Sequence, residues 1–325
     1  MQFQIPIYIP AIEPGITYRD KILLVGSCFT EHIGNYLKQV KFDTLQNPNG
    51  ILFDPVSVCE SLISYMDNDK YAADDLFYLN EAWHSWKHHS RFSAVHKEDS
   101  LRMINDSQEE AHGFLKECDW LMITLGSAFS YKLLKDNLYV ANCHKAPAQD
   151  FEKHLNTIEE IVTAFDTMLY RLFLFNPHVR VLFTISPVRH LRDGVVENNR
   201  SKARLIEAVH HLVNKFGRLH YFPAYELVID VLRDYRFYDI DMAHPNYPAT
   251  QFVLEKFAEN LMDKGTQELM ETIRKIMIAR NHKPFNPSSS QHKSFLENYY
   301  RQTLVLSKQY PFMDFKDELN YFGGF

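Results

Sequence analysis

Short apolar runs alternate with longer amphipathic stretches along most of this chain. The runs at 22–25, 120–125, 179–185 and 219–222 are mostly apolar on consecutive positions, as in strands that are buried on both faces of a sheet. After the first run, apolar residues recur with helical spacing between residues 29 and 40, all on one side of a helix. The chain therefore contains an early βα unit, in which Gly26 and Ser27 form the turn.

Further amphipathic stretches predict helices at 151–175, 199–216 and 248–261. The second stops at Gly217, a natural C-terminal cap, and the third has Pro248 in its first turn. Alternating strands and helices indicate an α/β fold with a mainly parallel sheet covered on both faces. Such sheets place their sites at the carboxyl ends of the strands, where the turn at Gly26 and Ser27 lies.

Two regions fit the alternation less well. Residues 56–117 are mostly polar and helical in pattern, with a middle rich in His and aromatic residues, and they predict an insertion. Residues 265–325 contain one predicted helix, at 268–279, and then a Pro- and Ser-rich loop and a tyrosine-rich tail with too few apolar residues for a separate core. We therefore expect an α/β domain over residues 1–262 and a helical extension packed on it over residues 263–325.

Composition narrows the function classes. The chain has 325 residues, of which 46% are hydrophobic, so a large core is available. The net charge of −6 and scattered basic residues argue against a nucleic-acid partner. No apolar run approaches the roughly 20 residues that cross a bilayer, and the first ten residues do not resemble a signal peptide. The four cysteines form no CxxC pair. We expect a cytoplasmic protein with no membrane partner.

The first candidate catalytic residue is Ser27. A serine at a strand-to-helix turn exposes its hydroxyl near the positive end of the following helix, which favours a developing oxyanion. Serine is also a preferred helix N-cap, so a purely structural role is the alternative. The adjacent Cys28 points in a different direction and is expected to be a small buried hydrophobe.

The second candidate is the Asp241-Met-Ala-His244 segment, just before the last predicted helix of the domain. Three residues apart on a turn, the Asp241 carboxylate can accept a hydrogen bond from the His244 imidazole and leave its other nitrogen as a base. A helix cap is again the structural alternative. A DxxH segment late in an α/β chain whose first βα turn carries Ser has the spacing of a Ser–Asp–His hydrolase of the SGNH type.

The segment Gly26-Ser-Cys-Phe29, followed by Thr30 where Ala is usual, resembles the signature of the GSCFA family, a branch of the SGNH (GDSL-like) hydrolase superfamily. The resemblance covers roughly residues 20–260. Supporting segments lie at 47–51, 84–90, 125–129, 140–145, 186–190 and 241–245.

This resemblance implies a three-layer α/β/α flavodoxin-like fold with Ser27 as nucleophile, His244 as base and Asp241 as its orienting partner. SGNH enzymes usually have an Asp between Gly and Ser, which this chain lacks. The resemblance also implies oxyanion donors after the second and third strands. Gly50 fits the first, whereas the Gly126 segment has no Asn, which makes Asn142 the substitute candidate. The backbone amide of Cys28 or Ser27 completes this predicted set.

Other residues are candidates for substrate contacts. The segment 84–90 places His84 and His88 four residues apart, which would suit a metal if it were helical, but no HExxH pattern follows. The resemblance favours a loop that contributes His88 and neighbouring aromatic residues to the cleft. Arg189, which follows the strand at 179–185, is a candidate for an anionic substrate group, with a salt bridge to a nearby acid as the alternative.

The sequence therefore predicts an esterase that removes a small acyl group from a small-molecule or glycan ester, through an acyl-enzyme on Ser27 and without a cofactor. Two alternatives stay open. One is a non-catalytic binding module on the same fold, which the missing Asn favours. The other is a metal-dependent hydrolase that uses the cluster at 84–89.

Overall fold

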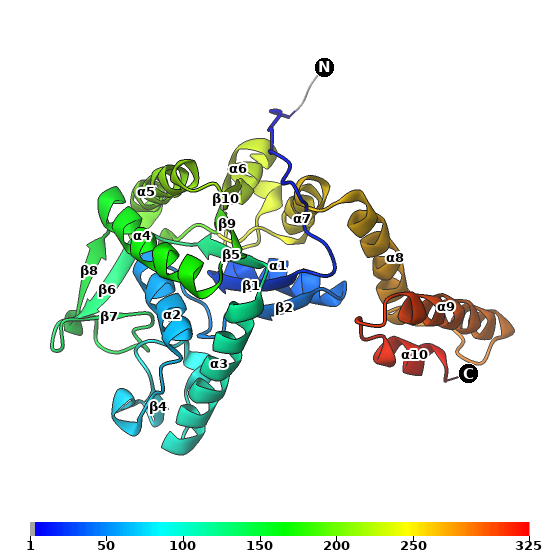
Figure 1. Ribbon diagram of the computed structural model, residues 1–325, viewed down its shortest axis with the longest axis horizontal. Helices are drawn as coiled ribbons and strands as arrows, with labels where there is room; N and C mark the ends of the chain where they lie inside the picture. Colours follow the sequence, from blue (N-terminus) through cyan, green and yellow to red (C-terminus); the bar gives the residue numbers. More distant parts are fainter. Residues whose placement is uncertain (1–3, 325) are drawn as a thin grey trace.

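A five-stranded parallel sheet forms the centre of the molecule (Figure 1). The computed structural model describes residues 4–324; residue 325 and residues 1–3, part of the N-terminal stretch considered above, lie outside it. The strands are β1 (Lys21–Gly26), β2 (Asp43–Gln46), β5 (Trp120–Leu125), β9 (Arg180–Ile185) and β10 (Leu219–Phe222), in the spatial order β10-β9-β5-β1-β2. Every neighbouring pair is parallel. Counted along the chain this is the order 2-1-3-4-5 of flavodoxin-like folds, which confirms the predicted fold class.

Helices cover both faces of the sheet. One face packs against α1 (Cys28–Gln39) and α7 (Tyr247–Leu261). The other packs against α2 (Pro55–Asp67), α3 (Lys97–Glu117), α4 (Ile158–Phe175) and α5 (Gly194–Lys215). Successive residues of β1 point to opposite cores, Ile22 and Leu24 to one and Leu23 and Val25 to the other, as the period of two requires.

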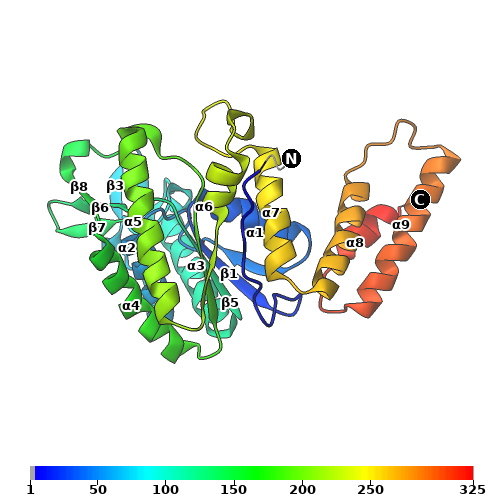
Figure 2. The same ribbon diagram turned by 90° about the horizontal axis from the view of Figure 1, so that it is seen from above.

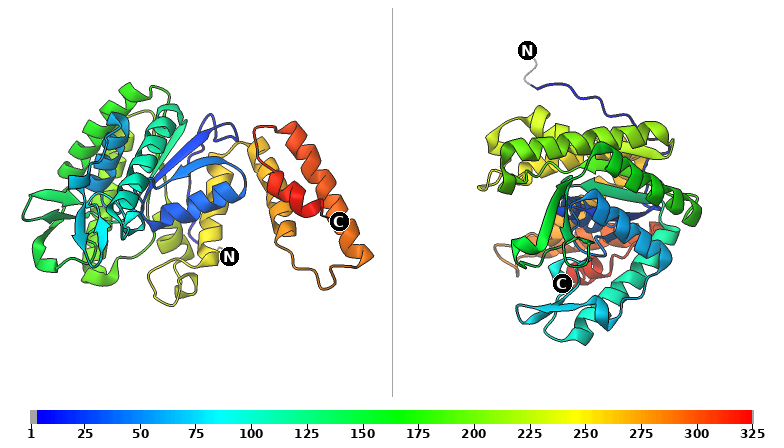
Figure 3. Two further views of the ribbon diagram at one scale, coloured as in Figure 1. Left: turned by 90° about the horizontal axis from the view of Figure 1, so that it is seen from below. Right: turned by 90° about the vertical axis from the view of Figure 1, so that its left-hand side faces the viewer.

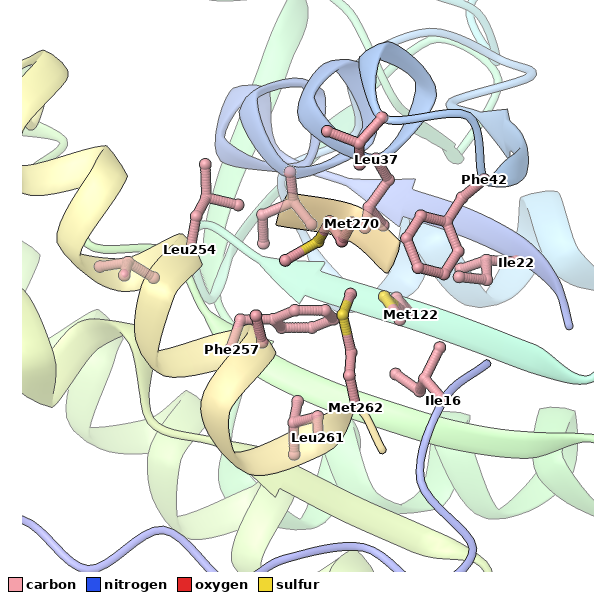
Figure 4. Close-up of a cluster of buried hydrophobic side chains, with 14 of the residues drawn as sticks. Ile16, Ile22, Leu37, Phe42, Met122, Leu254, Phe257, Leu261, Met262 and Met270 are labelled. Carbon is pink, nitrogen blue, oxygen red and sulfur yellow. The ribbon is translucent and has the colours of Figure 1, made fainter. Parts of the chain in front are cut away.

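The α1/α7 side of the core is shown in Figure 4. Phe257 of α7 points toward Met122 of β5, and Leu254 of α7 and Leu37 of α1 belong to the same cluster. Met270 belongs to the next helix, α8, so the C-terminal extension shares this core.

One helix prediction is wrong over its first residues. The stretch 151–175 begins as strand β8 (Phe151–Leu155), which pairs antiparallel with β6 (Phe129–Leu133); β7 (Leu138–Val140) completes this small sheet. Helix α4 begins only after Thr157, whose hydroxyl accepts the Glu160 amide while the Glu160 carboxylate accepts the Thr157 amide. This capping box fixes the start of the helix.

The predicted insertion at 56–117 has two parts. Helices α2 and α3 supply buried residues to the core on their side of the sheet and form the connection from β2 to β5. Between them, the hairpin of β3 (Phe77–Leu79) and β4 (Ala82–His84) lies on a small separate cluster of Leu76, Phe92 and Ile104. The part outside the layered core is this hairpin and its flanks.

The extension forms helices α8 (Lys264–Arg280), α9 (Ser290–Gln309) and α10 (Lys316–Phe322), at the β2 end of the sheet (Figures 2 and 3). A short helix, α6 (Ala224–Glu226), lies earlier, after β10. The buried Glu318 carboxylate of α10 accepts Lys41 Nζ at 2.8 Å and Arg280 Nη1 at 2.8 Å. Lys41 follows α1, so this ion pair joins the extension to the α/β domain.

Candidate active site

The turn between β1 and α1 holds the Ser27 hydroxyl at the carboxyl end of β1, next to the central strand β5. Gly26 has φ 142°, and a Cβ there would lie 2.1 Å from the Thr124 carbonyl oxygen, so only glycine fits against β5. Ser27 donates its amide to that same oxygen at 3.0 Å. Its side chain makes no capping hydrogen bond, although Ser27 is the N-cap of α1. The residue is fully buried, and its Oγ has no hydrogen-bond partner among residues 4–324.

The Asp241–His244 pair is formed as the sequence predicts. His244 Nδ1 lies 2.6 Å from Asp241 Oδ2, and Asp241 Oδ1 accepts the amides of His244 and Ala243. These hydrogen bonds lower the pKa of the Asp241 carboxyl to about 2, so it is ionised at neutral pH. The pair is about half exposed, which leaves the imidazole accessible from solvent.

Backbone contacts bring this turn to the same edge as Ser27. Arg189, which follows β9, donates its amide to the Ala243 carbonyl at 3.0 Å. His190 directly follows Arg189 and therefore lies beside the same turn. Ser27 Oγ and His244 are not hydrogen bonded to each other. Such contacts are often long before a substrate binds.

Gly126 allows Ser27 and His190 to approach each other. A Cβ on Gly126 would lie 3.1 Å from Ser27 Cβ, 3.2 Å from His190 Nε2 and 3.2 Å from Phe53 Cδ1. The His190 ring stands edge-on to Phe53, with ring centres 5.4 Å apart. Its Nε2 is buried and has no hydrogen-bond partner. The lack of a side chain at Gly126 therefore leaves the space in which these groups meet.

Several predicted oxyanion donors are already used within the fold. Gly50 donates its amide to the Asn47 carbonyl at 2.7 Å, and Gly126 donates to the Phe53 carbonyl at 2.9 Å. The Ser27 amide is likewise taken by Thr124. Cys28 is the first residue of α1, where an amide has no acceptor within the helix. Of the predicted backbone donors, the Cys28 amide is the one that the helix leaves free.

A cleft of about 980 Å³ opens beside this edge. Asn142 lines it, with its Oδ1 accepting the His144 amide at 2.8 Å. Arg189 also lines it and has no ion-pair partner among residues 4–324, since the nearby Asp193 carboxylate pairs with Lys153 instead. The wall further contains Lys145 and Arg192, so it carries a positive character.

His88 does not line this cleft. It is buried under the β3–β4 hairpin, with Nδ1 2.9 Å from Ser85 Oγ and its ring against Tyr71 and Phe92. Burial lowers its pKa to about 3. His84 ends strand β4 rather than lying on a helix, so His84 and His88 do not share the helical face that the metal alternative required. The neighbouring His89 is the residue of this segment that reaches the cleft.

Lys202 of α5 is a site residue that the sequence analysis missed. It is fully buried, and its Nζ donates to the Gly126 carbonyl at 2.6 Å and the Ser186 carbonyl at 2.7 Å, the residues directly after β5 and β9. Burial lowers its pKa to about 7. One feature of the sequence could have identified it: Asn198, Ser201 and Lys202 continue the buried face of α5 toward its amino end. Polar residues on a core stripe mark the point where the helix reaches the site.

The fold and the site together define a class of protein: a doubly wound α/β protein with a serine and an Asp–His pair at the carboxyl edge of its sheet. A model of the GSCFA family matches residues 21–257, and a model described as the GSCFA domain protein, C-terminal domain, matches residues 273–323. The chain belongs to the GSCFA family. No curated protein matches it.

Solved structures show a distant likeness. A carbohydrate esterase family 3 protein from Talaromyces cellulolyticus is 9% identical with a TM-score of 0.37, covering 79% of this chain and 99% of that one. A mutant acetyl esterase with acetate ion has 10% identity and a TM-score of 0.37, with 79% and 99% covered. The acetyl xylan esterase Est2A from Butyrivibrio proteoclasticus has 12% identity and a TM-score of 0.38, with 78% and 66% covered.

Two kinds of feature are absent from the described residues. Within residues 4–324, no three His, Cys, Asp or Glu side chains are grouped so that they could hold a metal ion. No helix in that part of the chain has both the length and the apolar character to cross a bilayer.

Proposed function

We propose that this protein is a serine hydrolase of the SGNH type that removes a small acyl group from a small-molecule or glycan ester. The observation that carries the proposal is the buried, unpartnered Ser27 hydroxyl at the start of α1, on the same sheet edge as the hydrogen-bonded Asp241–His244 pair. A serine needs an adjacent base to act as a nucleophile, and a carboxylate that orients the base completes the arrangement.

In the proposed reaction, His244 Nε2 takes the Ser27 proton as Oγ forms a bond to the ester carbonyl carbon. The carbonyl electron pair moves to oxygen, and Asp241 stabilises the imidazolium that results. The intermediate then breaks its bond to the leaving alcohol, which receives the proton from His244. Water, deprotonated by the same imidazole, then forms a bond to the acyl carbon; the bond to Ser27 Oγ breaks, and Oγ takes the proton back from His244 as the acid is released. The sequence of steps uses only groups of this chain and needs no cofactor.

Access to Ser27 requires a side chain to move, because the residue is fully buried. Phe53 lines the cleft and also lies beside the space at Gly126, so it is the ring between the two. We assign Phe53 as the group that the entering acyl chain displaces. The acyl group is then small, since it takes the space of the displaced Phe53 ring, next to His190.

The leaving-group side of the substrate lies in the cleft. Asn142 and Arg189 would contact it there, and the unpaired Arg189 guanidinium suits a substrate that carries a carboxylate or another anion. Gly50 and Gly126 contribute shape rather than donors, because their amides are already bonded.

Covalent labelling tests the nucleophile. The purified protein is treated with a fluorophosphonate probe, and the modified peptide is mapped by mass spectrometry. We expect a single label on Ser27 that disappears in Ser27→Ala, while the matched variant Ser57→Ala, at the start of α2, labels as the wild type does. A label that persists in Ser27→Ala would refute the nucleophile. Inertness of the wild type toward the probe and a panel of acetyl esters would favour the non-catalytic binding module.

A further inference from the structure

The proposed reaction needs donors for the oxygen that becomes negative, and the fold supplies few. The amides of Ser27, Gly50 and Gly126 each donate to a backbone carbonyl within the protein. The Cys28 amide at the start of α1 is one donor. Removing a single oxyanion donor typically costs 10²–10³-fold in rate, about 3–4 kcal/mol, so a second donor is expected.

His190 has the position of such a donor. Its Nε2 and Ser27 Cβ both lie within about 3.2 Å of one point, the place of a Cβ on Gly126. Among residues 4–324 the buried Nε2 atom has no hydrogen-bond partner, which is unfavourable and uncommon in a folded protein. The His190 residue is held from both sides: its amide donates to Asn198 Oδ1 at 2.9 Å, and its ring packs on Phe53. Asn142 is not among the three nearest atoms around that point.

The surroundings of His190 keep its ring neutral. Burial lowers the pKa of His190 to about 4, and the charges of Lys202 and His244 add to this, while Asp193 opposes it. A neutral imidazole carries one N–H, which can donate to an oxyanion without losing its proton. A base with a pKa near 4 is poorly matched to neutral pH. His190 is therefore suited to donate, whereas His244, oriented by Asp241, is suited to accept the proton.

We infer that His190 donates from Nε2–H to the oxyanion formed on Ser27, in the role for which the SGNH resemblance implies an asparagine. This inference rests on the proposed function. No covalent bond to His190 is made: the oxygen gains the carbonyl electron pair, the Ser27 proton goes to His244, and His190 keeps its own proton throughout.

A variant series separates donation from structure. With 4-nitrophenyl acetate as substrate, we expect His190→Phe to lower kcat by about 10²-fold with KM little changed. His190→Gln, which keeps an N–H donor, should recover at least tenfold of this loss and leave the pH dependence of kcat/KM as in the wild type. A His190→Phe enzyme as fast as the wild type would overturn the inference. So would a folded His190→Gln enzyme as slow as His190→Phe, which would make His190 the base.

A second measurement does not depend on turnover. Nitrogen-15 NMR of the imidazoles at pH 7, with His190→Gln used for assignment, should show a neutral His190 ring protonated on Nε2. A charged ring, or a proton on Nδ1 alone, would overturn the inference whether or not the protein hydrolyses esters. Failure of the proposed function is seen separately, as absence of phosphonate labelling in the wild type.

Discussion

Two buried histidines, His84 and His190, differ in the hydrogen bonds that their ring nitrogens make. Under the β3–β4 hairpin, His84 has both nitrogens engaged, with Ser93 Oγ at 2.6 Å and the Leu79 carbonyl at 2.9 Å. At the carboxyl edge of the sheet, His190 Nε2 has no partner and faces the same space as Ser27, whose hydroxyl is also unpartnered. Both are aromatic, His-containing regions, and both are buried.

An unpartnered nitrogen alone does not mark a site, since Nδ1 of His144, whose ring packs against His84, is also buried without a partner. What sets His190 apart is that its unpartnered nitrogen shares one space with the unpartnered Ser27 hydroxyl. A buried polar atom without a partner costs free energy, so folded proteins keep few of them, and those that remain require a functional explanation. The hairpin histidine has found partners within the fold, which fits a structural role. Ser27 Oγ and His190 Nε2 have no such partners, which fits a site where a ligand atom supplies the missing hydrogen bond.

The largest contrast is expected between His244 and His84. His244→Gln should lower kcat/KM for 4-nitrophenyl acetate by about 10⁴-fold, because the base and its carboxylate partner are lost together. His84→Leu should leave kcat/KM unchanged and lower the free energy of unfolding by about 1–3 kcal/mol, because Ser93 Oγ and the Leu79 carbonyl lose their partner. Steady-state kinetics and urea unfolding measure the two effects. Equal loss of activity in both variants would remove the distinction.

The pH dependence of stability tests that these imidazoles are held neutral. The pKa values of His88, His144 and His190 are lowered to about 3, 4 and 4, with burial as the main cause. Between pH 6.5 and those values the unfolded chain binds protons that the folded protein does not, so stability falls as the pH drops. At pH 5 the loss is about 2 kcal/mol for each ring.

Asp54 opposes this trend. Burial raises its pKa to about 6, so the folded protein takes up a proton there that the unfolded chain binds only at lower pH, and this adds stability of about 1 kcal/mol at pH 5. The stability lost at pH 5 through the three imidazoles exceeds the stability gained through the Asp54 carboxyl. Urea unfolding should show that the free energy of unfolding is several kcal/mol lower at pH 5 than at pH 7.5. In His190→Gln this difference should be about 2 kcal/mol smaller, because one of the three imidazoles is absent. Equal stability at the two pH values would contradict the account.

A smaller effect is expected from filling the space at Gly126. Gly126→Ala places a methyl group 3.1 Å from Ser27 Cβ and 3.2 Å from His190 Nε2, tighter than normal contact, so both groups must shift. A displacement of this kind costs about 10²-fold in kcat. The matched control is Gly113→Ala in α3, where no atom lies within 4 Å; it should stabilise the helix by up to about 1 kcal/mol with unchanged kcat. A fully active Gly126→Ala enzyme would show that Ser27 and His190 do not meet there.

The smallest effect concerns access. Phe53→Ala should raise the labelling rate of Ser27 severalfold for a bulky fluorophosphonate and less for a small one, because the ring between the cleft and Ser27 is removed. Labelling kinetics with the two probes measure the ratio. A ratio equal to that of the wild type would mean that substrates enter by another path.

Local pattern predicted four of the five strands of the parallel sheet and missed β2, a partly exposed strand at its edge. The strand runs at 120–125 and 219–222 coincide with β5 and β10, because strands buried on both faces are apolar throughout. The helix predicted at 151–175 failed at its start, because β8 depends on pairing with β6, a partner some twenty residues earlier that local spacing does not reveal. Tertiary pairing outweighed a helical-looking pattern there.

In the candidate site, too, local spacing predicted some features, whereas others depend on tertiary contacts. The Asp241–His244 contact followed from a three-residue spacing and is present. The hydrogen bond from the Gly126 amide to the Phe53 carbonyl, and the burial of Lys202 between two strand ends, depend on segments far apart in the sequence. No motif spacing carries that information, so the donor set had to come from the structure.

The most direct measurement of the central claim is a crystal structure of the protein after reaction with a small methylphosphonate fluoride. The account predicts a covalent bond between phosphorus and Ser27 Oγ. It also predicts that the phosphonyl oxygen accepts hydrogen bonds from the Cys28 amide and His190 Nε2, and that His244 Nε2 lies within hydrogen-bond distance of Ser27 Oγ. An adduct on any other residue, or a His244 ring that stays apart from Ser27 in the adduct, would contradict it.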